Sequence, residues 1–197
     1  MKRLALLLCV LFLLMPVDAR PEGIGSLGDN GCVCHGGIDE NVIIEITGFP
    51  EIYVPSQVYN ISISADGSSK DSVGNTSGGF RALMDGGNLE IEGSQEIEGG
   101  LTHTLESNKQ RMWNGTWVAP SNGDEGINLI LHVNLVNGDD TTSDDDWNTK
   151  TIFVSGPEYV GDTDAIEVGG EIVPIKLAVA LMILATIGIL AWIAIKD

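Results

Sequence analysis

The sequence has few residues that carry reactive chemistry. Its 197 residues include three cysteines and three histidines, and aromatic residues account for 6%. It contains no GxSxG nucleophile elbow, no HExxH pair and no GxxxxGK[ST] phosphate loop. No pair of carboxylates stands out from the general acidity. These absences exclude the hydrolases, zinc proteases and nucleotide-hydrolysing proteins that such motifs define, and we predict no catalytic residues and no enzymatic activity.

Basic residues are scarce as well. Ten Lys and Arg stand against 28 Asp and Glu, which gives a formal net charge of −18 at pH 7. A surface of this sign repels nucleic acid and anionic lipid headgroups, so nucleic acid is excluded as a partner. Self-repulsion that keeps an acidic protein soluble explains the charge, and an acidic face for a basic partner is the alternative.

Long apolar runs are confined to the two ends of the sequence. A positive start, an apolar stretch too short to span a bilayer and a plausible cleavage site predict a signal peptide over 1–19. Cys9 would be removed with it, and an uncleaved anchor is the alternative. In both cases we expect the central part of the chain to be exported.

The C-terminal run, residues 177–195, is free of charge and long enough for a transmembrane helix. We predict a spanning helix over 173–195 and a cytoplasmic tail of residues 196–197, because Lys196 agrees with the positive-inside tendency. A glycolipid-anchor signal is the alternative. The two ends together predict a single-pass protein of the plasma membrane with an extracytoplasmic domain.

The central part lacks a 3.6-residue apolar period, so helices are not expected there. Short alternating or apolar segments bounded by turn-forming residues predict strands instead. Their ranges are 42–46, 58–64, 79–84, 88–91, 111–119, 127–136 and 150–154. They favour an all-β fold, a single antiparallel β-sandwich of immunoglobulin-like type over 42–154. A Cys- and His-containing loop, 20–41, precedes it, and an acidic stalk, 155–172, follows it.

Two tryptophans are candidates for the core of this sandwich. Trp113 and Trp117 lie at even spacing on one predicted strand and therefore share a face. Rings of this size dominate sandwich cores, which predicts a buried pair. A carbohydrate-stacking surface that also uses Trp147 is the alternative.

Several short motifs follow one another along the chain: Gly48-Phe49-Pro50 with Tyr53-Val54-Pro55, Tyr59-Asn60-Ile61, Gly78-Gly79-Phe80-Arg81-Ala82, Leu101-Thr102-His103-Thr104, the segment 113–120 and the segment 133–139. Their order resembles Reeler-like extracellular β-sandwich domains, and most closely the microbial choice-of-anchor V group. The resemblance covers roughly residues 31–154. It implies an exported, surface-anchored sandwich that serves as a cell-surface binding or interaction module for an unknown surface or redox partner protein.

The stretch Cys32-Val33-Cys34-His35 holds both cysteines that follow the predicted signal peptide. The choice-of-anchor V group typically has two residues between these cysteines, whereas only Val33 separates them here. A Cys-x-x-Cys-His stretch is also the attachment signature of c-type haem. Cys34-His35 keeps the relation of the second cysteine to the axial histidine, which allows a haem held by one thioether, with His103 or His132 as the second axial ligand.

Two other interpretations of this loop stay open. A reducible disulfide between Cys32 and Cys34 fits an oxidising exterior, provided that the turn is tight. Alternatively, two thiolates and His35 form part of a copper or zinc site that His103 or His132 completes. A histidine within a strand, such as His132, is more often a packed residue than a ligand. The sequence thus predicts a surface binding module with a redox-capable loop, and an electron-transfer protein with haem or copper is the alternative.

An acidic loop and three sequons complete the candidate sites. The loop is a weak calcium candidate, because its carboxylates could supply oxygen ligands but do not have EF-hand spacing, and a solvated turn is the alternative. Its candidate ligands are Asp139, Asp140, Asp144, Asp145 and Asp146. The sequons predict N-glycosylation of the exported domain at Asn60, Asn75 and Asn114.

Overall fold

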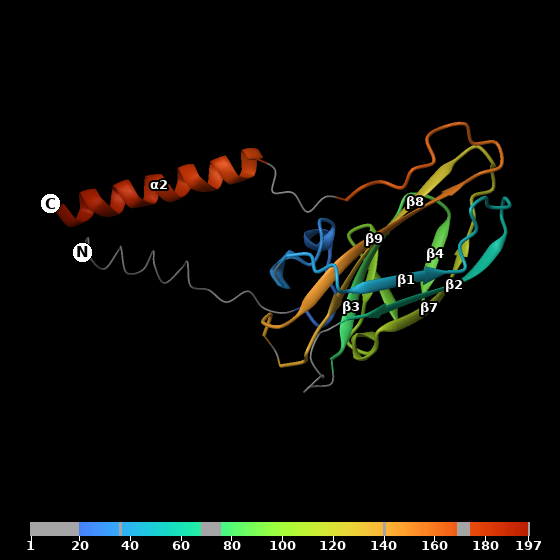
Figure 1. Cartoon of the computed structure of the whole chain (residues 1–197), viewed down its shortest axis with the longest axis horizontal. Coiled ribbons are helices and arrows are strands. Elements are labelled where there is room, and N and C mark those ends of the chain that lie inside the picture. The colour runs from blue at the N-terminus through green and yellow to red at the C-terminus, as the bar shows by residue number, and fades with distance from the viewer. Residues whose placement is uncertain (1–19, 36, 68–75, 140, 169–173, 197) are drawn as a thin grey trace. The chain divides into compact units, whose positions relative to one another are not determined.

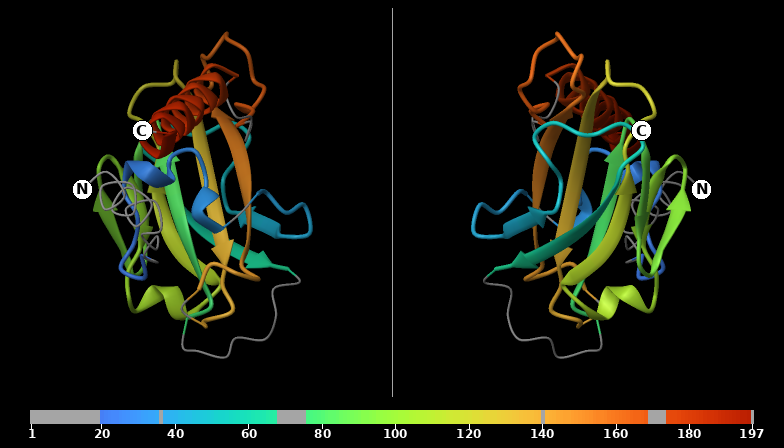
Figure 2. Two further views of the ribbon diagram at one scale, coloured as in Figure 1. Left: turned by 90° about the vertical axis from the view of Figure 1, so that its left-hand side faces the viewer. Right: turned by 90° about the vertical axis from the view of Figure 1, so that its right-hand side faces the viewer.

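The computed structural model describes residues 20–35, 37–67, 76–139, 141–168 and 174–196. Two antiparallel sheets pack face to face as a β-sandwich (Figures 1 and 2). One sheet has four strands in the order β1-β2-β7-β4, and the other has five in the order β5-β6-β3-β8-β9. The prediction of an all-β antiparallel sandwich is confirmed.

The strands are β1 (Ile43–Thr47), β2 (Val58–Asp66), β3 (Gly78–Met84), β4 (Asn88–Ile91), β5 (Ser94–Ile97), β6 (Gly100–His103), β7 (Met112–Val118), β8 (Gly126–Leu135) and β9 (Asp146–Ser155). Three short 3₁₀ helices, η1 (Ser26–Gly28), η2 (Val33–His35) and η3 (Ser107–Lys109), and the α-helix α2 (Pro174–Lys196) complete the described elements.

Alternation along the strands produces the core. On β2 every second residue, Ile61, Ile63 and Ala65, is buried between the sheets, because successive side chains of a strand point to opposite faces. β8 is buried on both of its faces towards its C-terminal end. The second buried face of β8 shows that something covers the outer side of the five-stranded sheet.

The tryptophan pair lies in this core, as predicted. Trp113 and Trp117 are both 0% exposed. Trp117 packs against Phe49, Tyr53 and Tyr59, with ring centroids 5.4, 5.8 and 5.6 Å away, and its Nε1–H donates to a backbone carbonyl, that of Gly86, at 3.1 Å. Because both rings are enclosed, the alternative of a carbohydrate-stacking surface on them is wrong.

The hairpin of β5 and β6 was not predicted from the sequence. Its strands have four residues each, and both are largely polar. The hairpin turns at Glu98 and Gly99, whose φ angles of 48° and 77° are both positive. Positive φ at both central residues is the geometry of a type I′ turn, which matches the twist of paired strands. Gly99 supplies that conformation without strain, whereas Glu98 gives no such signal in the sequence.

The described residues of the segment 20–41 (20–35 and 37–41), which we call the strap, cross the outer face of the five-stranded sheet from β5 to β9 (blue in Figure 2). At its start Glu22 accepts a hydrogen bond from Gln95 of β5, and Ile24 N donates to Thr102 Oγ1 of β6 at 3.1 Å. At its end Asp39 N donates to the carbonyl of Trp147 on β9 at 2.9 Å. The predicted N-terminal loop is therefore a cover over one sheet.

The C-terminal helix α2 lies outside the compact unit formed by residues 19–170. It contains the predicted membrane segment 177–195. In the part of the chain that the structure describes, no helix is both long and apolar enough to cross a membrane. The predicted spanning helix over 173–195 is therefore not supported by the structure. The predicted signal peptide, residues 1–19, lies outside the described residues.

Candidate functional site at the cysteine loop

The cysteine loop, residues 32–35, forms the part of the strap next to β9. Within it, η2 is closed by a hydrogen bond from His35 N to Cys32 O at 2.8 Å. The preceding Gly31 has φ of 105°, and a Cβ there would lie 2.2 Å from the indole of Trp147. Only glycine allows the backbone to lie so close to the ring. The loop is thus positioned by direct contact of its backbone with Trp147.

The two cysteines have different environments, and both thiols are free. Cys34 is exposed, whereas Cys32 is half-buried. Desolvation by burial, followed by the proximity of Cys34, raises the pKa of Cys32 to about 12. Because the thiolate is the nucleophile and the metal ligand, Cys32 is a poor candidate for either role at neutral pH. The predicted Cys32–Cys34 disulfide is not supported, since the structure has no bond between these thiols.

Alkylation should therefore distinguish the two thiols. With excess iodoacetamide at about pH 8, we expect Cys34 to be modified and Cys32 to remain free, because burial keeps the Cys32 thiol protonated at that pH. Fragmentation mass spectrometry of the peptide that holds both cysteines gives the site. Under denaturing conditions both should react, which serves as the control. Equal labelling of both thiols in the folded protein would contradict the buried position of Cys32.

The histidine of the loop is bound to the acidic loop that precedes β9. His35 Nδ1 lies 2.8 Å from Oδ2 of Asp145, whose side chain is 1% exposed. The other carboxylate oxygen of Asp145 accepts a hydrogen bond from Asn137 N at 3.0 Å. An Nδ1–H that donates to a carboxylate fixes the ring and leaves Nε2 as its basic nitrogen. The sequence separates these partners by more than a hundred residues and gave no sign of the pair.

His103 lies away from the cysteine loop. It ends β6, and its Nδ1 accepts a hydrogen bond from Phe80 N at 3.1 Å. Burial lowers the pKa of His103 below its ordinary value. Three strand spacings, about 14 Å, separate β6 from β9, on which the cysteine loop lies.

The structure therefore does not assemble the predicted haem or metal ligands. Within the described ranges, no group of three or more His, Cys, Asp and Glu side chains is placed to hold a metal ion. Cys32, Cys34 and His35 are together on the strap, and His103 belongs to a different strand pair. A copper or zinc site built from these residues is not supported.

His132 is a packed residue, which agrees with the expectation for a histidine within a strand. Its Nδ1 lies 2.6 Å from Thr149 Oγ1, which donates to it, and its Nε2–H donates to the carbonyl of Asp29 on the strap at 3.2 Å. The side chain is fully buried. Burial lowers its pKa, and the nearby Asp29 opposes this shift.

These histidines predict a loss of stability in mild acid. His103 and His132 have pKa values below the ordinary 6.5 in the folded state, so the unfolded chain binds protons more readily. Their contribution is complete above pH 6.5 and is lost as the pH falls towards the folded pKa values. We expect the free energy of unfolding, from urea titrations, to fall between about pH 7 and pH 5. His132→Gln should flatten this slope, and an unchanged slope would contradict the assignment.

Arg81 lies beneath the strap and makes several hydrogen bonds there. It was not among the predicted site residues. It is 0% exposed. Its Nε donates to Asp29 Oδ1 at 2.8 Å, and Nη1 donates to carbonyl oxygens of Ile97 and Gly100 at 2.6 and 2.9 Å. A Cβ at Gly100 would lie 2.6 Å from the guanidinium carbon. Arg81 thus joins the strap, β3 and the β5–β6 turn. The sequence signal that could have indicated this role is a charged residue between two apolar ones, in Phe80-Arg81-Ala82.

The acidic loop uses its carboxylates for local contacts. Asp139 accepts hydrogen bonds from Thr141 N and Oγ1 at 2.9 and 2.8 Å, which lowers its pKa. Burial, followed by the carboxylates of Asp39 and Asp145, raises the pKa of Asp146. The described carboxylates, which include Asp144, form no metal-holding group, so the calcium interpretation is not supported; Asp140 lies outside the described residues.

Comparison with known proteins gives similarity at the level of solved structures. No family model matches the sequence, and no curated protein matches it. The chain is similar to the reeler domain of human F-spondin, at 18% identity over 62% of this chain and 97% of that one, with a TM-score of 0.40. It is also similar to a conjugative transposon lipoprotein from Bacteroides eggerthii, at 18% identity over 59% and 98%, with a TM-score of 0.41.

A conjugate transposon protein from Bacteroides vulgatus is similar at 12% identity over 65% of this chain and 94% of that one, with a TM-score of 0.43. Reeler domains are thus among the structures that this chain resembles. The choice-of-anchor V group is not directly shown by these comparisons.

Proposed function

We propose that this protein is a membrane-tethered extracytoplasmic β-sandwich that binds a partner protein at the cell surface through the strap. One observation carries the proposal: large apolar side chains of the strap point into solvent. Leu27 is 71% exposed, Val33 57% and Ile38 41%. The strap is meanwhile held to the sheet by Arg81 and His132. Apolar side chains on a fixed backbone favour association, since little ordering is needed on binding.

A photo-reactive amino acid at the strap tests this binding. We would place it at position 33 in the full chain and irradiate intact cells of the native host. Position 160 provides the control, because Val160 is 98% exposed but lies outside the strap. A discrete cross-linked surface protein from position 33 alone supports the proposal. The same pattern of products from both positions would overturn it.

The tether rests on the charge-free run 177–195 in the sequence. We expect the full chain to remain in the membrane fraction after carbonate extraction, and external protease to remove the domain from intact cells. Deletion of 177–195 should release the domain into the medium. Recovery of the full chain as a soluble intracellular protein would contradict both the tether and the location.

An electron-transfer protein with a single-thioether haem at Cys34 and His35 is the second candidate. One contact favours it: Asp145 binds Nδ1 of His35 and leaves Nε2 of that ring as the nitrogen for an axial bond, and Cys34, the preceding residue, is exposed. The raised pKa of Cys32 opposes it. The absorption spectrum and the denatured intact mass of protein made with haem-attachment machinery decide between the candidates. A haem band with added covalent mass would replace the binding module with this alternative.

A further inference from the structure

The two sequons of the four-stranded sheet meet in the strand register. β2 and β7 are antiparallel neighbours, with Asn60 opposite Thr116 and Ser62 opposite Asn114. Each asparagine thus lies across from the hydroxyl residue of the other sequon. The two asparagines form the diagonal pair of this arrangement, and diagonal residues are about 7–8 Å apart on one face of a sheet. A slip of one residue would place them on opposite faces.

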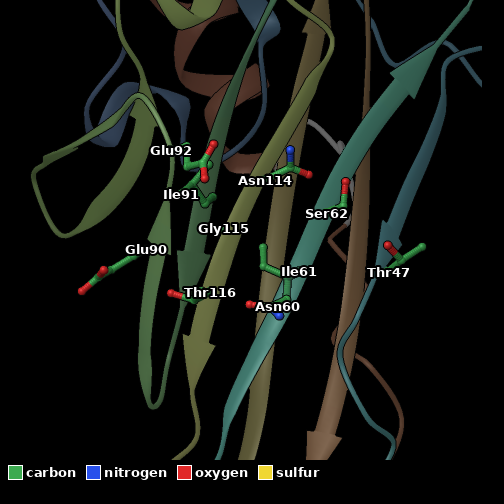
Figure 3. Close-up of a pocket in the computed structure, with 10 residues that line it drawn as sticks. All are labelled: Thr47, Asn60, Ile61, Ser62, Glu90, Ile91, Glu92, Asn114, Gly115 and Thr116. Atoms are coloured by element: carbon green, nitrogen blue, oxygen red, sulfur yellow. The ribbon is translucent and has the colours of Figure 1, made fainter.

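Both asparagines lie on the outer face of the sandwich and are exposed. The residues between the sequon positions, Ile61 and Gly115, face the other way. Figure 3 shows Asn60 and Asn114 on adjacent strands, lining one open groove. The groove has a volume of about 590 Å³. The strap covers the outer face of the other sheet, whereas this face has no such cover among the described residues.

The lining of the groove is chemically suited to sugar. Seven of the ten lining residues have an amide, hydroxyl or carboxylate group: Thr47, Ser62, Glu90, Glu92 and Thr116 besides the two asparagines. Such groups donate to and accept from sugar hydroxyls, and none of the lining residues is aromatic or basic. The groove therefore offers hydrogen bonds to an attached glycan along both strands.

We propose that Asn60 and Asn114 carry two N-linked glycans that lie side by side in this groove and cover the outer face of the four-stranded sheet. The inference rests on the exported location in the proposed function. Asn60 and Asn114, the two glycan acceptors, lie in the middle of their strands, where the backbone is paired with the neighbouring strand. Attachment therefore precedes folding of the sandwich, while the chain is still extended.

Intact mass of the full chain, made in a eukaryotic secretory host, tests the proposal. Only molecules whose domain is accessible to external protease are analysed. We expect peptide N-glycosidase to remove a glycan from each of these two asparagines, with conversion of residues 60 and 114 to Asp, in addition to any glycan at Asn75. Asn60→Gln and Asn114→Gln should each remove one glycan, and the double variant should remove both. Asn75→Gln is the matched sequon control, and it should leave both of these glycans in place.

A second pair of variants separates modification from folding. Thr116→Ser keeps the sequon and should keep the glycan at Asn114, whereas Thr116→Ala should lose it with the asparagine intact. The glycans should also protect Met112, beside Asn114 and 58% exposed, from oxidation by peroxide, and enzymatic removal should restore its reactivity.

The outcomes distinguish the two proposals. Accessible protein with neither Asn60 nor Asn114 modified would overturn the glycan inference alone. Modification at both sites with unchanged oxidation of Met112 would overturn the covering of the sheet. A chain that is never accessible from outside would instead contradict the exported location on which the inference rests.

Discussion

Replacing Arg81 with methionine is expected to lower the free energy of unfolding by about 3–5 kcal/mol, because it removes the buried partner of the partly exposed Asp29 and leaves carbonyl oxygens without donors. Arg81 is 0% exposed and has Asp29 as its partner at 2.8 Å. The carbonyls that lose a donor are those of the β5–β6 turn, Ile97 and Gly100. Urea unfolding of residues 19–170, which form a compact unit, measures the change.

The same variant should also loosen the strap. Asp29 would keep only its backbone hydrogen bonds, with His132 and within the strap to Ser26, so Cys32 should become accessible to iodoacetamide in the folded protein. Lys109→Met is the matched control: this lysine pairs with Glu106 at 3.1 Å on the surface, where such pairs contribute about 0–0.5 kcal/mol. Arg81→Lys keeps the charge without the planar fork and should fall between the two. A loss below about 1 kcal/mol in Arg81→Met would refute the role assigned to Arg81.

Replacing Trp117 with alanine should cost about 3–5 kcal/mol, the range found when large aromatic core residues are truncated. Trp117 is 0% exposed and is enclosed by three aromatic rings of the connections and β2. Its removal leaves a cavity and also takes the donor from the carbonyl of Gly86. Chemical unfolding followed by circular dichroism gives the loss.

Two control variants show whether the loss of stability in Trp117→Ala comes from the core. Trp117→Phe keeps a ring but not the N–H, so it should cost less than alanine. Met112→Ala, on the same strand with a side chain 58% exposed, should change stability by less than about 1 kcal/mol. If Met112→Ala and Trp117→Ala were equally destabilising, the core would not be where the structure places it.

The fold could be predicted from local patterns wherever a strand has one buried face. All seven predicted strands are present, and most of their ends agree within two residues. β9 is the exception: it begins at Asp146, because the acidic run and Trp147 gave no alternating pattern there. The β5–β6 hairpin was missed for the related reason that its short strands are mostly polar.

The strap could not be predicted, because its contacts join residues that are distant in sequence. Asp29 meets Arg81 and His132, and His35 meets Asp145. No local period reports such pairs. The sequence marked Cys32, Cys34 and His35 as unusual, but it could not show that the histidine already has a carboxylate partner. The sequence shows the sequons of Asn60 and Asn114, whereas their position in one groove follows only from the β2–β7 register.

β9 is the outermost strand of its sheet, and its position has a consequence for the crowded surface on which we place the protein. An open strand edge offers unpaired N–H and C=O groups to another molecule and promotes aggregation. Here the chain itself pairs with that edge near both ends of β9, through parallel bridges from Ile38 to Trp147 and from Ile52 to Ser155. Between them Lys150 reaches across and donates to the carbonyl of Ile44 at 3.0 Å. Neighbouring copies therefore find little free edge to extend along β9.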